Sequence, residues 1–179
     1  TTITNGTTAS SDNTGGNYVG AVYVYKRTGT TWVQEAYIKA ANNDIKDFFG
    51  YGIDLDNNTL VVGAFSEESN QSTITNGTSA SSDNSFAGEA GAAYVYKRTG
   101  TTWAQEAYIK SINNSGSDYF GTSVSIDNDT LAVGATYEGK VYVYKRADNN
   151  TWSHEAYINP VNGGARFGYS VSLHNNTLA

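Results

Sequence analysis

Internal repetition constrains the fold of this chain more than any single residue does. Residues 20–39 (GAVYVYKRTGTTWVQEAYIK) return almost unchanged at residues 91–110 (GAAYVYKRTGTTWAQEAYIK) and more loosely at residues 139–159. Repeats of this length are supersecondary units that bury their apolar faces against one another. The sequence therefore predicts one array of repeats rather than unrelated domains.

A second block alternates with the first. The stretch FGYGIDLDNNTLVVG at residues 49–63 matches residues 120–134, and residues 167–179 begin a third copy. The repeating unit is about 47 residues long. A polar insertion rich in Ser, Thr and Asn lengthens one copy at residues 67–88, and its twin lies at residues 2–13.

Each unit reads as four β-strands, A to D. Strands A and B flank the two-residue turn Asn57-Asn58, and asparagine tolerates the positive φ of a type I′ hairpin turn. Valine alternates with tyrosine along strand C, so both of its faces need a neighbouring sheet. Strands A and B are expected at residues 52–55 and 60–64. Strands C and D are expected at residues 21–26 and 32–38, in the preceding copy of the repeat.

Composition agrees with an all-β chain. The 179 residues include 14 Tyr and 19 Gly but 1 Pro and no Met, a balance that favours strands and turns. Repeated four-stranded antiparallel units with covered inner strands are typical of β-propeller blades. We therefore predict an all-β fold of propeller blades, with about three blade equivalents in this chain.

Blade boundaries follow from the repeat. We assign residues 1–40 to strands C and D of a first blade, 48–110 to a second blade with an inserted loop at 65–90, 119–159 to a third, and 167–179 to strands A and B of a fourth. Such an array would have open sheet edges, which invite pairing. Two arrangements account for this: a window of a longer propeller or repeat array, which we favour, or strands A and B of one chain completing C and D of another, in a six-bladed dimer or a filament.

Charge narrows the choice of partners. The formal net charge is −6, which disfavours binding to nucleic acid. There is no cysteine, and no apolar run approaches the ~20 residues of a membrane span. We expect neither membrane insertion nor a disulfide framework.

A resemblance adds to this interpretation. The motif FG at residues 49–50 precedes a hairpin and then VGAF at 62–65; an acidic Ser-Asn stretch at 67–70, a polar loop with DNS at 83–85 and a GAVYVY-like strand at 91–96 follow. This order resembles the FG-GAP repeat of integrin α-chain heads and, more closely, of bacterial surface proteins. The resemblance covers essentially the whole chain. It implies a β-propeller on secreted or surface-anchored proteins, without implying one ligand.

The chain departs from that family in two ways. Phe65 and Thr136 replace the proline of GAP. Integrin-type repeats carry a calcium loop between strands A and B, whereas this chain has a two-residue turn next to Asp54 and Asp56. Calcium takes six to eight oxygen ligands, so we favour turn chemistry over calcium there.

The polar insertion is the most plausible functional segment, because loops on a rigid scaffold often carry binding. Its acidic and amide side chains would bind calcium if the loop folds back on itself. The alternative, which we favour, is a solvated loop with no specific role. The candidate ligands are Glu67, Glu68, Asp83 and Asn84.

Glycosylation would require a eukaryotic secretory pathway or an equivalent. Eight N-x-S/T sequons are candidate acceptors, although duplication and composition multiply such motifs. They begin at Asn5, Asn57, Asn70, Asn76, Asn113, Asn128, Asn149 and Asn175.

Catalytic motifs are not found. His154 and His174 replace other residues at their repeat positions and have no nucleophile motif nearby, so we expect polar strand positions rather than catalysis. The strand aromatics, among them Tyr23, Tyr25 and Trp32, suggest either a sugar-binding platform or packing between blades. Their regular spacing favours packing.

These observations predict a non-enzymatic, extracellular or cell-surface repeat segment with a structural or adhesive role. Its expected partners are other protein chains, including copies of itself, bound through loops and open blade edges, with no cofactor. The alternative is a ligand- or glycan-binding head that depends on a cation. A hydrolase is the least favoured alternative.

Overall fold

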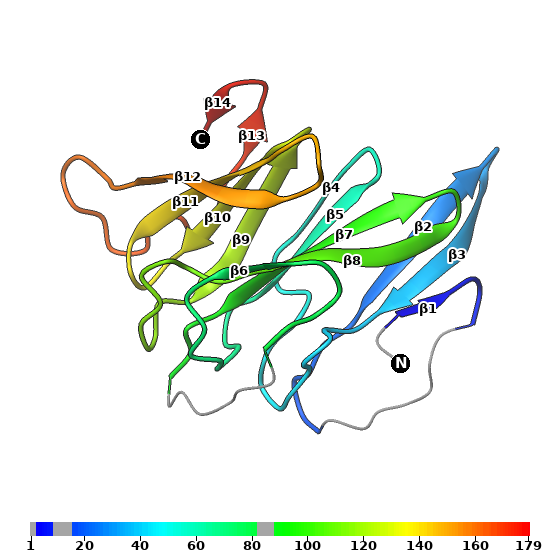
Figure 1. The fold of residues 1–179 in the computed structure, drawn as a ribbon, viewed down its shortest axis with the longest axis horizontal. Helices are drawn as coiled ribbons and strands as arrows, with labels where there is room; N and C mark the ends of the chain where they lie inside the picture. Colours follow the sequence, from blue (N-terminus) through cyan, green and yellow to red (C-terminus); the bar gives the residue numbers. More distant parts are fainter. Residues whose placement is uncertain (1–2, 9–15, 82–87) are drawn as a thin grey trace.

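The structure, a computed structural model, describes residues 3–8, 16–81 and 88–179, and this part of the chain is all-β. Antiparallel sheets stand side by side in sequence order, like the blades of a fan (Figure 1). Within the described ranges no helix is long and apolar enough to cross a membrane. The strands are β1 (Ile3–Asn5), β2 (Val22–Thr28), β3 (Thr31–Ile38), β4 (Ile53–Asp56), β5 (Thr59–Ala64), β6 (Ile74–Asn76), β7 (Ala92–Thr99), β8 (Thr102–Ile109), β9 (Phe120–Asp127), β10 (Thr130–Ala135), β11 (Lys140–Arg146), β12 (Trp152–Ile158), β13 (Leu173–His174) and β14 (Thr177–Leu178).

Strands A to D of one repeat form one antiparallel sheet. The third blade has the spatial order β9-β10-β11-β12, and the second has the order β4-β5-β7-β8-β6. The first sheet contains β1-β3-β2, and β13 pairs with β14. The predicted class, all-β with four-stranded propeller blades, is confirmed. Each C–D pair carries one β-bulge, between Val24 and Tyr25 in the first sheet.

The A–B hairpins turn at asparagine, but not in the predicted turn type. Asn57, Asn128 and Asn175 have φ of 52°, 53° and 51°, and the residue after each is not at positive φ. A type I′ turn requires positive φ at both central positions, so that prediction is wrong. Only the first central residue of each turn therefore adopts the left-handed φ that asparagine tolerates.

Two apolar cores lie between consecutive sheets. Tyr94 and Tyr96 on one face of β7 are fully buried in a core that they share with Val22 and Val24 of β2. Val95, on the opposite face of β7, belongs to a second core toward the third blade. The predicted coverage of both faces of strand C therefore holds in the second blade.

The first sheet differs on one face. Tyr23 and Tyr25 occupy the repeat positions of Tyr94 and Tyr96, yet they are 50% and 51% exposed. The prediction that both faces of strand C are covered is wrong for these two residues, because no described element packs against their face. An identical pattern thus gives either a core or a surface, depending on whether another blade adjoins it.

Part of the polar insertion forms an additional outer strand. In the second blade β6 pairs with β8, and in the first sheet β1 pairs with β3. Ile3 and Ile74 pack against the two cores from these strands. The segment predicted as a loop is therefore in part a fifth strand, held by one isoleucine in an otherwise polar stretch.

The FG and GA motifs lie where consecutive blades approach most closely. A Cβ added to Gly63 would lie 1.9 Å from the carbonyl oxygen of Gly121. One blade further on, a Cβ on Gly134 would lie 2.0 Å from the carbonyl oxygen of Gly168. Real Cβ atoms do not approach backbone atoms so closely, so this contact requires glycine.

Candidate functional site

Blades are joined by a glutamate on strand D. Glu35 Oε1 accepts a charge-assisted hydrogen bond from Arg98 Nη2 at 2.5 Å, and Glu35 Oε2 accepts one from Trp103 Nε1 at 3.1 Å. The backbone N–H of Trp103 also donates to Asn5 Oδ1 on β1, at 2.8 Å. Burial raises the pKa of Glu35, but the bonds from Arg98 and Trp103 outweigh it and hold that pKa below its usual value.

The same contact recurs between the second and third blades. Glu106 Oε1 accepts hydrogen bonds from Arg146 Nη1 at 3.1 Å and from Trp152 Nε1 at 2.8 Å. The backbone N–H of Trp152 donates to Asn76 Oδ1 on β6, at 2.7 Å. A glutamate facing an arginine–tryptophan pair is therefore a property of the repeat and not of one position.

Both halves of this blade interface are also exposed. Arg27 and Trp32 occupy the repeat positions of Arg98 and Trp103, and Trp32 is 63% exposed. Glu155, on β12, occupies the glutamate position and is exposed. Within the described residues neither Arg27 nor Glu155 forms an ion pair. The molecule thus presents the two complementary halves on two different sheets.

A buried ion pair stabilises the segment that follows strand B of the second blade. Glu67 Oε2 lies 2.6 Å from Lys110 Nζ, and the two side chains are 1% and 0% exposed. Asn42 Nδ2 donates to Glu67 Oε1 at 2.8 Å, and Ser69 Oγ donates to Oε2 at 3.2 Å. Burial lowers the pKa of Lys110, although the neighbouring carboxylate of Glu67 acts in the opposite direction. Both carboxylate oxygens of Glu67 therefore have partners.

Two buried aspartates recur near this ion pair. Burial raises the pKa of Asp47 to about 7 and that of its repeat counterpart, Asp118, to about 6, against the lowering effect of one backbone hydrogen bond each. Those bonds come from the N–H of Asp44 and of Ser115, both at 2.7 Å. Because the same bond recurs in both repeats, we attribute to both aspartates a structural role in the turn that precedes the FG motif.

The predicted calcium ligands lie partly outside the described residues, which do not include Asp83 and Asn84. The carboxylate of Glu67 faces Lys110, and the adjacent Glu68 is half-buried. Residues 3–8, 16–81 and 88–179 contain no cluster of three or more His, Asp or Glu side chains suited to a metal ion. The calcium interpretation stays a prediction.

The acidic residues beside the A–B turn bond to the next blade. Asp54 Oδ2 accepts hydrogen bonds from Ser125 Oγ at 2.9 Å and from the N–H of Ile126 at 2.8 Å. Asp56 Oδ2 accepts one from the N–H of Asn128 at 2.8 Å. These carboxylates join the inner strands of consecutive blades, which favours a structural interpretation of this connection over a calcium loop.

The histidines lie on strands. His154, on β12, packs against Tyr142 and Tyr144, with ring centroids 6.0 Å and 5.6 Å apart. His174 is exposed at the end of β13. Absence of catalysis stays a prediction.

The sequon asparagines fall into different settings. Asn5 Nδ2 and Asn76 Nδ2 donate to the carbonyl oxygens of Trp103 and Trp152 in the next blade, each at 3.3 Å. A glycan on either nitrogen would displace these contacts between blades. Glycosylation at any of the eight sites stays a prediction. The other six lie in turns and loops: Asn57, Asn70, Asn113, Asn128, Asn149 and Asn175.

A row of aromatic rings lines the end of the blades at which strand A begins and strand B ends. Its ring centroids lie 5.2 Å apart for Tyr18–Phe48, 4.9 Å for Phe48–Phe65, 5.5 Å for Phe65–Tyr119 and 5.6 Å for Tyr119–Tyr137. We call these five residues the aromatic row. The row runs from the segment that precedes β2 of the first sheet to the third blade.

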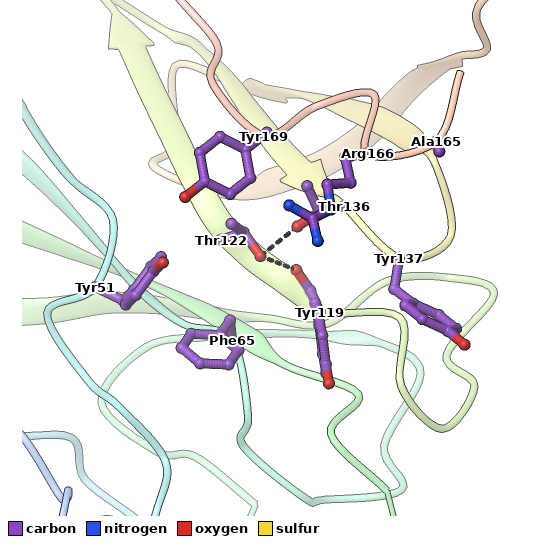
Figure 2. A pocket seen from close by; sticks show the side chains of 9 residues that line it. All are labelled: Tyr51, Phe65, Tyr119, Thr122, Thr136, Tyr137, Ala165, Arg166 and Tyr169. Carbon is purple, nitrogen blue, oxygen red and sulfur yellow. Dashed lines mark hydrogen bonds between the residues drawn. The ribbon is translucent and has the colours of Figure 1, made fainter. Parts of the chain in front are cut away.

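A pocket of about 550 Å³ opens beside the aromatic row, between the second and third blades and the segment that leads to β13 (Figure 2). Among the residues that line it, Arg166 alone carries a formal charge at neutral pH. A hydrogen bond with Tyr169 raises the pKa of Tyr51. The pocket is lined by Tyr51, Phe65, Tyr119, Thr122, Thr136, Tyr137, Ala165, Arg166 and Tyr169.

Sequence reasoning looked for binding aromatics on strands C and D and missed this group. A signal was present next to the FG motif, where Phe48, Tyr119 and Arg166 precede the motif phenylalanine in successive repeats. All three have positive φ, of 54°, 55° and 69°. Such backbone is rare for bulky residues and is concentrated at functional sites.

Fold and interfaces define the class of this protein: an all-β repeat array of propeller blades. The model of the FG-GAP repeat family matches residues 32–96 and 103–158, more than half of the chain. The protein belongs to the FG-GAP repeat family. A comparison with curated proteins gives no match. The bacterial surface subtype stays a prediction.

Proposed function

We propose that this protein is a non-catalytic structural or adhesive module of the cell exterior, which binds other protein chains by joining further blades to its own array. The observation that carries the proposal is the repeated blade interface. Its glutamate half and its arginine–tryptophan half are each used within the chain and each exposed on an outer sheet. Exposed aromatic surface of this kind typically marks an interaction site.

Blades of the same repeat fit these exposed faces, and blades supplied by a second copy of the chain are the case that can be tested directly in solution. In the second blade, strand B pairs with strand C, with Leu60 opposite Tyr96. The equivalent edges, on β14 and β2, have no strand partner among the described residues. By the same register Leu178 of one copy would lie opposite Tyr25 of the other. The β13–β14 hairpin and the β2–β3 hairpin then complete one four-stranded blade.

Side-chain contacts support the same arrangement. With β2 added beside β14, Arg27 and Trp32 of the second copy come to face Glu155 of the first, as Arg146 and Trp152 face Glu106. This interface is heterologous, because different surfaces of the two copies meet. Repeated use of it produces a ring or a filament.

Association in solution tests this proposal. Sedimentation velocity at rising concentration should show the wild-type chain forming species larger than one copy. Arg27→Glu or Glu155→Arg alone should weaken association by about tenfold or more, because each places like charges at the contact. The double variant Arg27→Glu/Glu155→Arg should recover most of it.

Lys46→Glu is the matched control, because this exposed lysine lies in the loop between β3 and β4 and on neither of the two outer blade faces. Its association should equal that of the wild type. A wild-type chain that keeps the mass of one copy at its highest soluble concentration would refute the proposal. The proposal would also be refuted if Arg27→Glu and Glu155→Arg each associated as strongly as the wild type.

A further inference from the structure

We propose that the pocket beside the aromatic row binds a saccharide that carries a carboxylate group, such as a uronic acid unit. The tyrosine rings would pack against the sugar ring, and the Arg166 guanidinium would bind the carboxylate. This binding site is separate from the blade faces that carry self-association. Its residues lie at the loop end of the inner strands, whereas Trp32 and Glu155 lie on the outer strands.

The lining suits a sugar ring. Tyr51, Tyr137 and Tyr169 are all more than half exposed, so their rings are open to contact. Tyrosine combines an apolar ring face with a hydroxyl group, and sugars offer both C–H and O–H groups to it. Figure 2 shows Tyr51 and Tyr169 on one side of the pocket and Tyr137 on the other. The volume of about 550 Å³ lies within the range of small-ligand sites.

Charge in the lining selects an anionic ligand. Arg166 is exposed, and no carboxylate pairs with it among the described residues. Its planar guanidinium forms bidentate bonds with a carboxylate and can also stack on an aromatic face. Figure 2 shows the Arg166 side chain in the upper part of the pocket and Phe65 in the lower part. A ligand with one carboxylate and a stackable ring matches both features of the lining.

Two lining positions also have left-handed backbone, a feature that they share with the equivalent Phe48 outside the pocket. Arg166 and Tyr119 hold φ of 69° and 55°, a conformation that costs about 1 kcal/mol or more for such residues. Thr136 Oγ1 donates to Thr122 Oγ1 at 2.6 Å, which in turn donates to the carbonyl oxygen of Tyr119 at 2.6 Å. These bonds fix the floor of the pocket below the exposed rings. The backbone that carries Tyr119 and the threonines below the rings are therefore held in place, while the Arg166 side chain is exposed and open to a ligand.

Binding of an α-1,4-linked trigalacturonate and of its methyl ester, measured by titration calorimetry, tests the proposal. The full chain is used at a concentration where it is monomeric. The acid should bind about tenfold more tightly than the ester, because only the acid offers a carboxylate to arginine. Arg166→Gln should remove that preference. Tyr169→Ala should lower the affinity for both ligands by a similar factor.

Tyr25→Ala is the matched control, since this half-exposed tyrosine lies on a blade face far from the pocket; its affinity for the acid should equal that of the wild type. No measurable binding of trigalacturonate would overturn the proposal. Equal affinity for acid and ester, or an affinity unchanged in Arg166→Gln, would overturn it as well. An acidic peptide that binds through Arg166 while the saccharide does not would show that the ligand class is wrong.

Discussion

Replacing Gly63 with alanine should destabilise the protein by about 3 kcal/mol or more, at the upper end of what overpacking costs in a closely packed core. The added Cβ would lie 1.9 Å from the carbonyl oxygen of Gly121. Gly63 lies near the end of β5 and Gly121 near the start of β9, and the oxygen that the Cβ would meet is a backbone atom, so no side chain can rotate away to make room. The two blades must separate, and the apolar core between them must loosen. Urea denaturation followed by far-UV circular dichroism measures this change.

Gly164→Ala is the matched control for that substitution. Gly164 is not at positive φ, and a Cβ there meets only side-chain atoms at 3.7 Å, an ordinary van der Waals distance. Its unfolding free energy should stay within about 0.5 kcal/mol of the wild-type value. A Gly63→Ala variant as stable as Gly164→Ala would show that consecutive blades do not approach as closely as the structure has them.

Replacing Lys110 with methionine should destabilise the protein by about 3–5 kcal/mol, because the substitution leaves the Glu67 carboxylate buried without its counterion. Among the described residues, the Glu67 carboxylate would keep neutral donors such as Asn42 and Ser69 in place of the lysine. Buried Asp47 adds further negative potential when it ionises. Adding Glu67→Gln to the variant should recover a large part of the loss, since the buried charge is then gone.

Lys140→Met supplies the comparison for this ion pair. Lys140 Nζ lies 2.5 Å from Glu138 Oε1, but its side chain is partly exposed, and such pairs contribute about 0–1 kcal/mol. Thermal unfolding of these three variants and of the wild type would distinguish the cases. If Lys110→Met destabilises the protein no more than Lys140→Met does, the buried ion pair does not stabilise the fold as described.

The blades themselves could be predicted because periodicity fixes them. Valine and tyrosine alternate along strand C with the period of a β-strand. The repeat places this strand among the four strands of each blade, in a fixed order. Tyr94 and Tyr23 nevertheless have nearly the same local sequence and opposite burial. Burial depends on the neighbouring sheet, which local sequence does not encode. The extra strand β6 was missed for a related reason, because one isoleucine in a polar segment gives no periodic signal.

The candidate site was harder to predict than the fold. Its residues come from three successive repeats, and Tyr51 and Tyr169 meet in space although more than a hundred residues separate them in the chain. The blade contacts were equally hidden: Glu35 and Trp103 recur in the sequence, but only the packing of one blade on the next brings them together. Recurrence shows that a residue belongs to the repeat, whereas geometry shows what it contacts.

Acrylamide quenching of tryptophan fluorescence tests most directly whether blades pack face to face as described. Three variants would each keep one tryptophan, with phenylalanine in the other two positions, and would be studied at a dilution that keeps the chain monomeric. Trp32 is 63% exposed, whereas its repeat counterparts Trp103 and Trp152 are each 3% exposed. Face-to-face packing of the blades predicts efficient quenching of Trp32 and strong shielding of the other two. Equal quenching at all three positions would contradict it.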